Sequence, residues 1–225
     1  MKIGVLLSGC GVYDGSEIQE SVLTLLAIAE AGHESVCISI DDNQHHVINH
    51  ITGEEMNESR NMLVESARIA RGAATEISTI SPADIDALVI PGGFGSAKNF
   101  TNWAFEGPEG TIRPDVKLLI VNMINVGKPI VALCVSPVVL AKAMKDSNIK
   151  LNLTIGSTKS ASPYSISQFM QGINATGAKS TERELDQVLI DKENKIISAP
   201  CYMMDATILE IHQNIKQAID ALNHL

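Results

Sequence analysis

The chain has 225 residues, of which 45% are hydrophobic and 19% charged, and its net charge is −9. This length and composition suit one soluble α/β domain that buries both faces of a sheet. The negative charge repels phosphate backbones, and no basic stripe with interleaved aromatic residues is present, so we expect no nucleic-acid partner. No apolar run is long enough to span a bilayer, so we expect no membrane partner either.

Apolar runs and helix-period segments alternate along the chain. We predict strands over 3–7, 35–40, 87–90, 129–133 and 151–155, and a hairpin over 187–198. We predict helices over 16–31, 58–71, 115–126, 137–144 and 205–222, and an irregular segment over 41–57. The first helix is expected to carry one apolar face, formed by Ile18, Val22, Leu25, Leu26 and Ala29. The alternation, without a linker, predicts a single domain over 1–225 that forms a three-layer α/β/α sandwich with a mainly parallel sheet.

Ligands of such sheets bind beyond the carboxyl ends of the strands, and Cys134 occupies one of these ends. It follows the apolar strand 129–133 and precedes Ser136, a possible helix cap, and Pro137, which suits the first helical position. A strand-to-helix turn of this kind resembles the nucleophile elbow of α/β hydrolytic enzymes. The helix start predicts an exposed, acidified thiol. The alternative is a buried cysteine that acts as a small hydrophobic residue.

Two side chains are candidates for a base beside this thiol. Glu17 lies at the first turn of the helix after the loop 8–15 and could reach Cys134. Its alternative role is to stabilise the start of its own helix. His50 is the best placed of three clustered histidines, although solvated loop histidines would give the same pattern.

The loop after the strand 87–90 offers backbone donors. Gly92 and Gly93 expose amides without obstructing side chains, and together with the Val135 amide they could hold an oxyanion on a substrate attacked by Cys134. An ordinary loop that needs positive φ would also use these glycines. The glycines of the loop 8–15 do not have dinucleotide spacing, and no Walker lysine follows, so nucleotide binding is not expected.

The cysteine pattern argues against metal and structural disulfides. Cys10, Cys37, Cys134 and Cys201 lie far apart without CxxC spacing, so we expect no zinc site and no disulfide framework. A reduced, cytoplasmic location follows as the expectation. Cys10 could approach Cys134 and form a reversible disulfide, although an inert thiol is the simpler alternative. Cys201 has no partner that the sequence identifies.

Several segments in combination resemble one family. They are Ser8–Glu17, Val47–His50, Arg60–Gly72 and Pro91–Asn99. They are similar to the isoprenoid-biosynthesis glyoxalase family ElbB, a branch of the PfpI and class I glutamine amidotransferase-like superfamily. The resemblance implies a flavodoxin-like fold, a homodimer, Cys134 as nucleophile and Glu17 as its carboxylate partner. It also implies conversion of small 2-oxoaldehydes such as glyoxal into glycolate without glutathione, metal or other cofactor, or a related deglycase activity.

The sequence differs from the peptidase and amidotransferase branches of this superfamily, and these differences narrow the expected activity. PfpI-like peptidases carry His directly after the nucleophile, where this chain has Val135. Amidotransferases carry a distal His-x-Glu, whereas Glu210-Ile211-His212 has the reversed order. Peptidase and glutaminase activities are therefore disfavoured. A glyoxalase-type lyase is the main hypothesis. A non-catalytic redox-sensing or binding protein that uses the same cysteine is the alternative, since an exposed acidic thiol oxidises readily.

Overall fold

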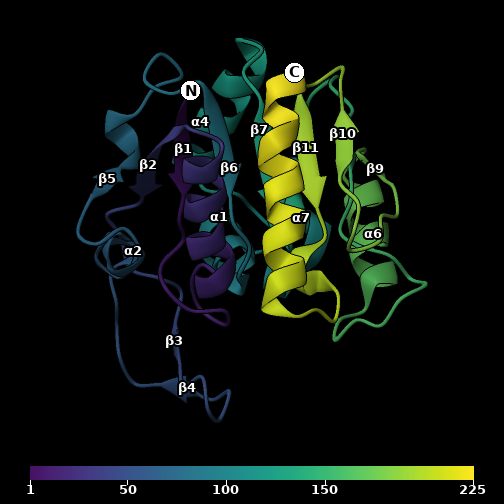
Figure 1. The fold of residues 1–225 in the computed structure, drawn as a ribbon. Helices are drawn as coiled ribbons and strands as arrows, with labels where there is room; N and C mark the ends of the chain where they lie inside the picture. Colours follow the sequence, from purple (N-terminus) through teal and green to yellow (C-terminus); the bar gives the residue numbers. More distant parts are fainter.

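The computed structural model describes residues 1–225, and its centre is a seven-stranded sheet (Figure 1). The strand order is β10-β11-β7-β6-β1-β2-β5, and every neighbouring pair is parallel except β10–β11. These strands are β1 (Lys2–Leu6), β2 (Glu34–Ser39), β5 (Ala74–Glu76), β6 (Ala87–Ile90), β7 (Ile130–Leu133), β10 (Leu189–Asp191) and β11 (Ile196–Ala199). Two small sheets pair β3 (Val47–Ile48) with β4 (Glu55–Met56) and β8 (Asn152–Leu153) with β9 (Lys179–Ser180).

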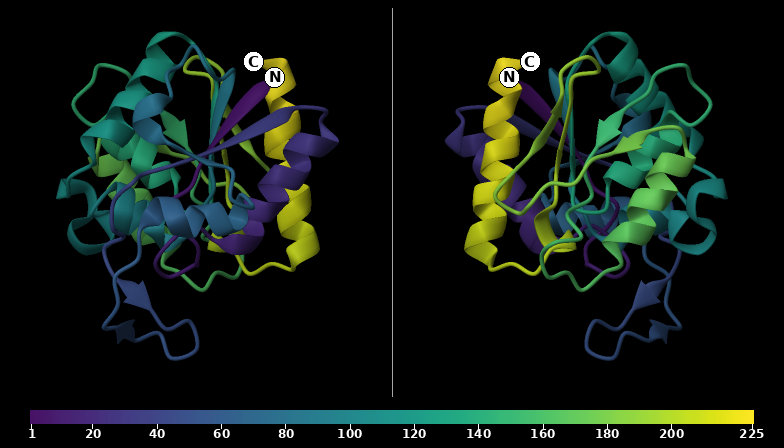
Figure 2. Two further views of the ribbon diagram at one scale, coloured as in Figure 1. Left: turned by 90° about the vertical axis from the view of Figure 1, so that its left-hand side faces the viewer. Right: turned by 90° about the vertical axis from the view of Figure 1, so that its right-hand side faces the viewer.

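Helices cover both faces of the sheet. Figure 2 shows α1 and α7 on one side and α4 and α6 on the other. The helices are α1 (Ile18–Glu30), α2 (Met62–Ile69), α3 (Trp103–Glu106), α4 (Pro114–Asn125), α5 (Pro137–Ala143), α6 (Ile166–Ala175) and α7 (Ile208–Asp220). None of them has the length and apolar character needed to cross a membrane. The predicted flavodoxin-like α/β/α architecture is confirmed.

The central strands are buried on both faces, as their sequences predict. All four residues of β6 and all four of β7 have no exposed surface. A parallel strand covered by helices on both sides needs an unbroken apolar run rather than alternation. This is why the short runs 87–90 and 129–133 could be assigned from the sequence.

Local assignments fail where local patterns compete with tertiary contacts. The helix predicted over 58–71 begins only at Met62, because the Asn61 side chain accepts a hydrogen bond from the Val64 amide and caps it. The segment predicted as irregular contains the β3–β4 hairpin, which projects from the body of the molecule (Figure 1). The strand predicted over 151–155 is reduced to β8, outside the main sheet.

The predicted apolar face of α1 is only partly right. Ile18, Val22 and Leu26 are exposed to between 44% and 49%, whereas Glu20 and Ile28 are buried. Because α1 starts at the carboxyl edge of the sheet, polar side chains rather than the apolar stripe face the core there. The homodimer stays a prediction, and the exposed stripe offers apolar surface for it.

Asn99 ties together the loops at this edge. Its amide nitrogen donates to the carbonyls of Ser8 and Asp14, each at 2.8 Å, and its amide oxygen accepts from the His45 backbone at 2.8 Å. The side chain is buried, so these bonds satisfy groups that water does not reach. One residue thereby joins the segment after β6 to the loop after β1.

We predict that Asn99→Ala lowers the free energy of unfolding by about 1–3 kcal/mol, because buried carbonyls and an amide lose their partner. Urea unfolding monitored by circular dichroism measures the change. Asn125→Ala, at an exposed position, is the matched control and should change stability little. Equal stability of the two variants would contradict the role given to Asn99.

Candidate active site

Cys134 lies on a sharp turn between β7 and α5. Its φ is +58°, a left-handed conformation that is rare outside glycine, so the backbone here is strained. The amide of Cys134 donates to the Ala199 carbonyl at 2.9 Å, which fixes the turn against β11. The predicted elbow geometry is present.

Ser136 supports this turn differently from the predicted helix cap. Its hydroxyl accepts a hydrogen bond from the Leu133 amide at 2.8 Å and donates to the Ile90 carbonyl at 2.7 Å. No capping bond from its side chain is present. The buried hydroxyl thus links the elbow to the end of β6, directly before the glycine loop.

The carboxylate partner of the thiol is Glu20. Glu20 is fully buried, and its side chain is hydrogen-bonded to Cys134. One carboxyl oxygen accepts from the Gly92 amide at 3.0 Å and the other accepts from the Tyr202 amide at 3.1 Å. The side chain therefore touches the ends of β6, β7 and β11 together.

Burial controls the protonation of this pair. It raises the pKa of Glu20 to about 8, and the nearby Glu17 carboxylate contributes in the same direction. Burial also raises the pKa of Cys134 well above its ordinary value, and the negative charge of Glu20 is the second largest cause of this increase. The thiol is only 6% exposed. The expectation of an exposed, acidified thiol is therefore wrong in the resting site, because desolvation outweighs the short helix start.

Glu17, the predicted partner of Cys134, lines the same pocket, but its carboxylate is hydrogen-bonded to the backbone of α1 rather than to the thiol. Its carboxylate accepts from the Glu20 amide at 2.6 Å and so caps α1. Burial raises its pKa. Helical spacing could have pointed to Glu20, since residues three apart share a face, but the apolar stripe of α1 suggested the opposite orientation.

The predicted oxyanion donors have different roles. The Gly92 amide is taken by Glu20, and a Cβ on Gly92 would lie 2.4 Å from the Cys134 Cβ. Gly92 therefore provides space rather than a free donor. The Gly93 amide donates toward the Cys134 sulfur, and the Val135 amide has no hydrogen-bond partner within the protein. Gly93 and Val135 both line the pocket at the thiol.

His50, the other predicted base, is not brought to Cys134. Its Nε2 accepts from the Tyr13 amide at 3.2 Å, and its Nδ1 lies 3.0 Å from the Ile48 carbonyl. Both ring nitrogens are thus occupied at the base of the hairpin, and the ring does not line the thiol pocket. His50 anchors the loop that contains Tyr13.

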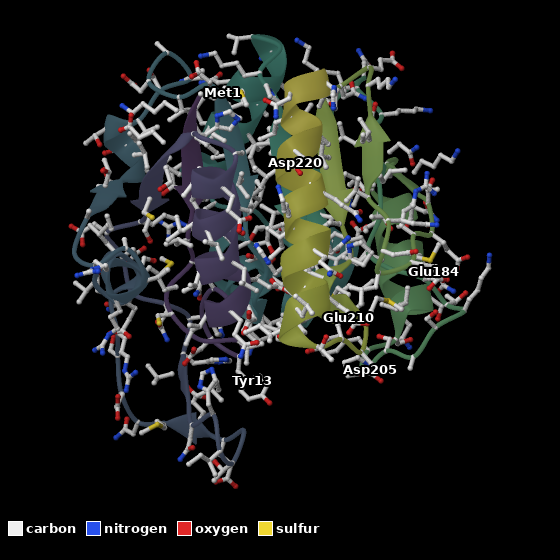
Figure 3. The ribbon with its side chains drawn as sticks, viewed as in Figure 1. Met1, Tyr13, Glu184, Asp205, Glu210 and Asp220 are labelled. Carbon is white, nitrogen blue, oxygen red and sulfur yellow. The ribbon has the colours of Figure 1, made fainter.

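The pocket at Cys134 has an inner and an outer part. The inner cavity has a volume of about 10 Å³, enough for one water-sized group. An outer hollow of about 370 Å³ shares Val12, Glu17, Tyr164 and Tyr202 with it. Figure 3 shows Tyr13 and Asp205 at this end of the molecule, and Asp205 lines the outer hollow. Larger ligands reach the sulfur only if the shared wall moves.

The cysteine next to Cys134 is Cys201, which the sequence did not single out. The Cys201 sulfur lies near the backbone amide of Cys134. Cys10, for which an inert thiol was the simpler expectation, lies near Glu65 and Arg68 and does not line the thiol pocket. The signal that would have identified Cys201 is the adjacency of β7 and β11, which is not local in the sequence.

Comparison with known proteins places this fold and elbow in a class. No family model matches the chain. DJ-1beta of Drosophila melanogaster is 15% identical with a TM-score of 0.56 and covers 98% of this chain and 89% of its own, and at that identity it shows the fold alone. The molecule thus has a DJ-1-like fold.

Nearer relatives define the family. An isoprenoid biosynthesis protein with an amidotransferase-like domain from Ehrlichia chaffeensis is 35% identical, with a TM-score of 0.90 and full coverage of both chains. Glutamine amidotransferase-like class 1 domain-containing protein 3 of Homo sapiens is 35% identical and covers 95% of this chain and 79% of its own. The rat ES1 protein homolog shows the same identity and coverage of 95% and 80%. The chain belongs to this ElbB and ES1 family of amidotransferase-like proteins.

These relatives correct one expectation. The human and rat proteins are named as mitochondrial, and so is the ES1 protein of Danio rerio. The cytoplasmic location expected from the cysteine pattern is contradicted by them. Reduced cysteines do not distinguish one reducing compartment from another.

We predict that Glu20 makes the stability fall as the pH rises. A carboxyl whose pKa is raised from 4.5 to about 8 in the folded state stabilises the protein fully below 4.5 and loses this contribution as the pH passes 8. The loss should be on the order of a few kcal/mol. Urea unfolding across this range should show a flatter profile for Glu20→Gln, and parallel profiles would contradict the assignment.

Proposed function

We propose that this protein is a cofactor-independent glyoxalase-type lyase that converts small 2-oxoaldehydes, such as glyoxal, into hydroxy acids such as glycolate. The observation that carries the proposal is the contact between the elbow thiol of Cys134 and the buried carboxyl of Glu20, with the amides of Gly93 and Val135 beside the sulfur. A nucleophile, a proton carrier and oxyanion donors are the parts that this reaction needs.

In its reactive form, the pair of Cys134 and Glu20 carries one proton in total. In that form the sulfur of Cys134 adds to the aldehyde carbon while the proton remains on Glu20. The new carbon–sulfur bond leaves a hemithioacetal alkoxide, whose charge the Gly93 and Val135 amides stabilise. The two groups titrate together, so the pH profile reports the pair rather than either residue.

The next step moves a proton between the two substrate carbons. Glu17 faces the space where the substrate would lie, and we assign it the removal of the proton from the carbon bound to sulfur. The resulting enediolate is protonated at the neighbouring carbon, which gives a thioester. Water then hydrolyses the thioester, releasing glycolate and the free thiol, so one water is consumed in each turnover.

A deglycase reaction uses the same first steps. The adduct of a 2-oxoaldehyde with an amine or thiol presents the same two carbons to Cys134. The outer hollow of about 370 Å³ has room for the larger leaving group.

A redox-sensing role of the same thiol is the second candidate function. The inner cavity of about 10 Å³ favours it, because a small oxidant needs less movement of Tyr164 and Tyr202 than glyoxal does. Turnover of glyoxal distinguishes the two candidates.

We predict that the purified protein forms glycolate from glyoxal, and that Cys134→Ser abolishes this turnover. Glu20→Gln should lower kcat by about a hundredfold or more, since it removes the proton carrier. The rate of the wild type should rise with pH up to about 8, as the pair of Cys134 and Glu20 passes from its two-proton form to its one-proton form. Glycolate measured by chromatography provides the readout.

The matched control is Glu34→Gln, which neutralises an exposed carboxylate away from the site and should leave the rate unchanged. Equal turnover by the wild type and Cys134→Ser would refute the proposal. An unchanged kcat in Glu20→Gln would refute the role of Glu20 alone.

A further inference from the structure

The ends of β7 and β11 bring two cysteines together. Leu133 and Ala199 are register partners, so Cys134 and Cys201 each follow closely after this pair on neighbouring parallel strands. The Cys134 amide donates to the Ala199 carbonyl at 2.9 Å, and Cys201 begins the turn that follows Ala199 and Pro200. Disulfides span Cα separations of about 4.4–6.8 Å. The strand register thus brings the two cysteines to neighbouring positions at one edge of the sheet.

The side chains also converge. Regular strands would send residues offset by one step to opposite faces, but Cys134 has φ +58° and Cys201 has φ +45°, so both leave the strand geometry. The Cys201 sulfur lies near the backbone amide of Cys134, which donates to the Ala199 carbonyl, and Glu20 is a neighbour of both thiols. The buried side chain of Asn214 accepts a hydrogen bond from the Cys201 amide at 3.0 Å and so holds the backbone of Cys201 in this conformation.

Access to the two sulfurs differs. Cys134 lines the inner pocket, whereas Cys201 has no exposed surface and does not line it. A small oxidant that enters the pocket therefore meets Cys134 first. Cys201 can react only with a group already formed on Cys134.

We propose that Cys201 is the resolving thiol of Cys134, so that the pair forms a reversible disulfide when a hydroperoxide oxidises the site. The Cys134 sulfur first attacks one peroxide oxygen; a sulfur–oxygen bond forms, the oxygen–oxygen bond breaks and the leaving oxygen takes up a proton. The Cys201 sulfur then attacks Cys134; a disulfide forms, the sulfur–oxygen bond breaks and hydroxide leaves with the Cys201 proton as water. Two thiols are oxidised and one peroxide is reduced.

Glu20 is placed to move the protons. It is hydrogen-bonded to Cys134 and lies near Cys201, so in each step its carboxyl can pass a proton to the departing oxygen and take up the proton of the attacking thiol in return. Water is nearly excluded there, which makes a fixed proton donor more valuable than it would be at the surface.

The disulfide would protect the elbow thiol. Without a resolving partner, a sulfenic acid proceeds under excess peroxide to sulfinic acid, which thiols do not reverse. The inference concerns sulfur chemistry alone and does not depend on the conversion of glyoxal.

Peptide mapping after oxidation tests the inference. Wild-type protein is treated with hydrogen peroxide, its remaining thiols are alkylated, and unreduced peptides are analysed by mass spectrometry. We expect a cross-linked peptide pair that contains Cys134 and Cys201 and that dithiothreitol separates. In Cys201→Ser the cross-link should be lost completely, and Cys134 should instead carry two additional oxygens.

Matched variants make the result specific. Cys10→Ser removes the more exposed thiol and should leave the cross-link intact, and Cys201→Ala provides a second variant if the serine disturbs the buried site. Sulfinic Cys134 without a cross-link in the wild type would overturn the inference, and so would Cys134 that stays reduced under excess peroxide. A cross-link from Cys134 to Cys10 or Cys37 would overturn it equally. If neither Cys201 variant folds, the presence or absence of the Cys134–Cys201 cross-link in the wild-type peptide map is sufficient to test the inference.

Discussion

The carboxyl of Glu20 is the constraint on which the site depends. It contacts the ends of three strands at once, through the Gly92 amide, the Tyr202 amide and the Cys134 sulfur. A buried carboxyl is costly unless its oxygens are satisfied, and here each accepts a backbone bond. Gly92 must lack a side chain for this approach, since a Cβ would lie 2.4 Å from the carboxyl oxygen. The glycine, the acid and the cysteine therefore form one packed unit.

The sequence was sufficient for the fold and the elbow. Unbroken apolar runs identify β6 and β7, and the turn 134–137 combines a strand end with residues suited to a helix start. Parallel topology then brings the turn and the glycine loop to the same edge. These features are local, or follow from a general rule of sheet topology, which explains why they could be predicted.

The residues that determine the chemistry of the site come from segments that are distant in the sequence. Helical periodicity indicated that Ile18, Val22 and Leu26 face the core, whereas these three side chains are exposed and Glu20 is buried. At the edge of the sheet, the contact with three loops outweighs the apolar stripe. The ionisation of Cys134 follows from burial by surrounding segments, and the neighbouring Cys201 follows from strand order. Neither can be read from the residues next to the cysteine.

The β3–β4 hairpin has a mechanical consequence for the pocket. It is held to the body by the Ile48 amide, which donates to Asp14, and by the Tyr13 amide, which donates to His50. The next residue back, Val12, forms part of the pocket wall, and its carbonyl accepts from the Phe94 amide at 2.8 Å. The hairpin therefore contacts the segment that forms one side of the entrance to the thiol, so a displacement of the hairpin would be transmitted to that entrance through Asp14 and Tyr13.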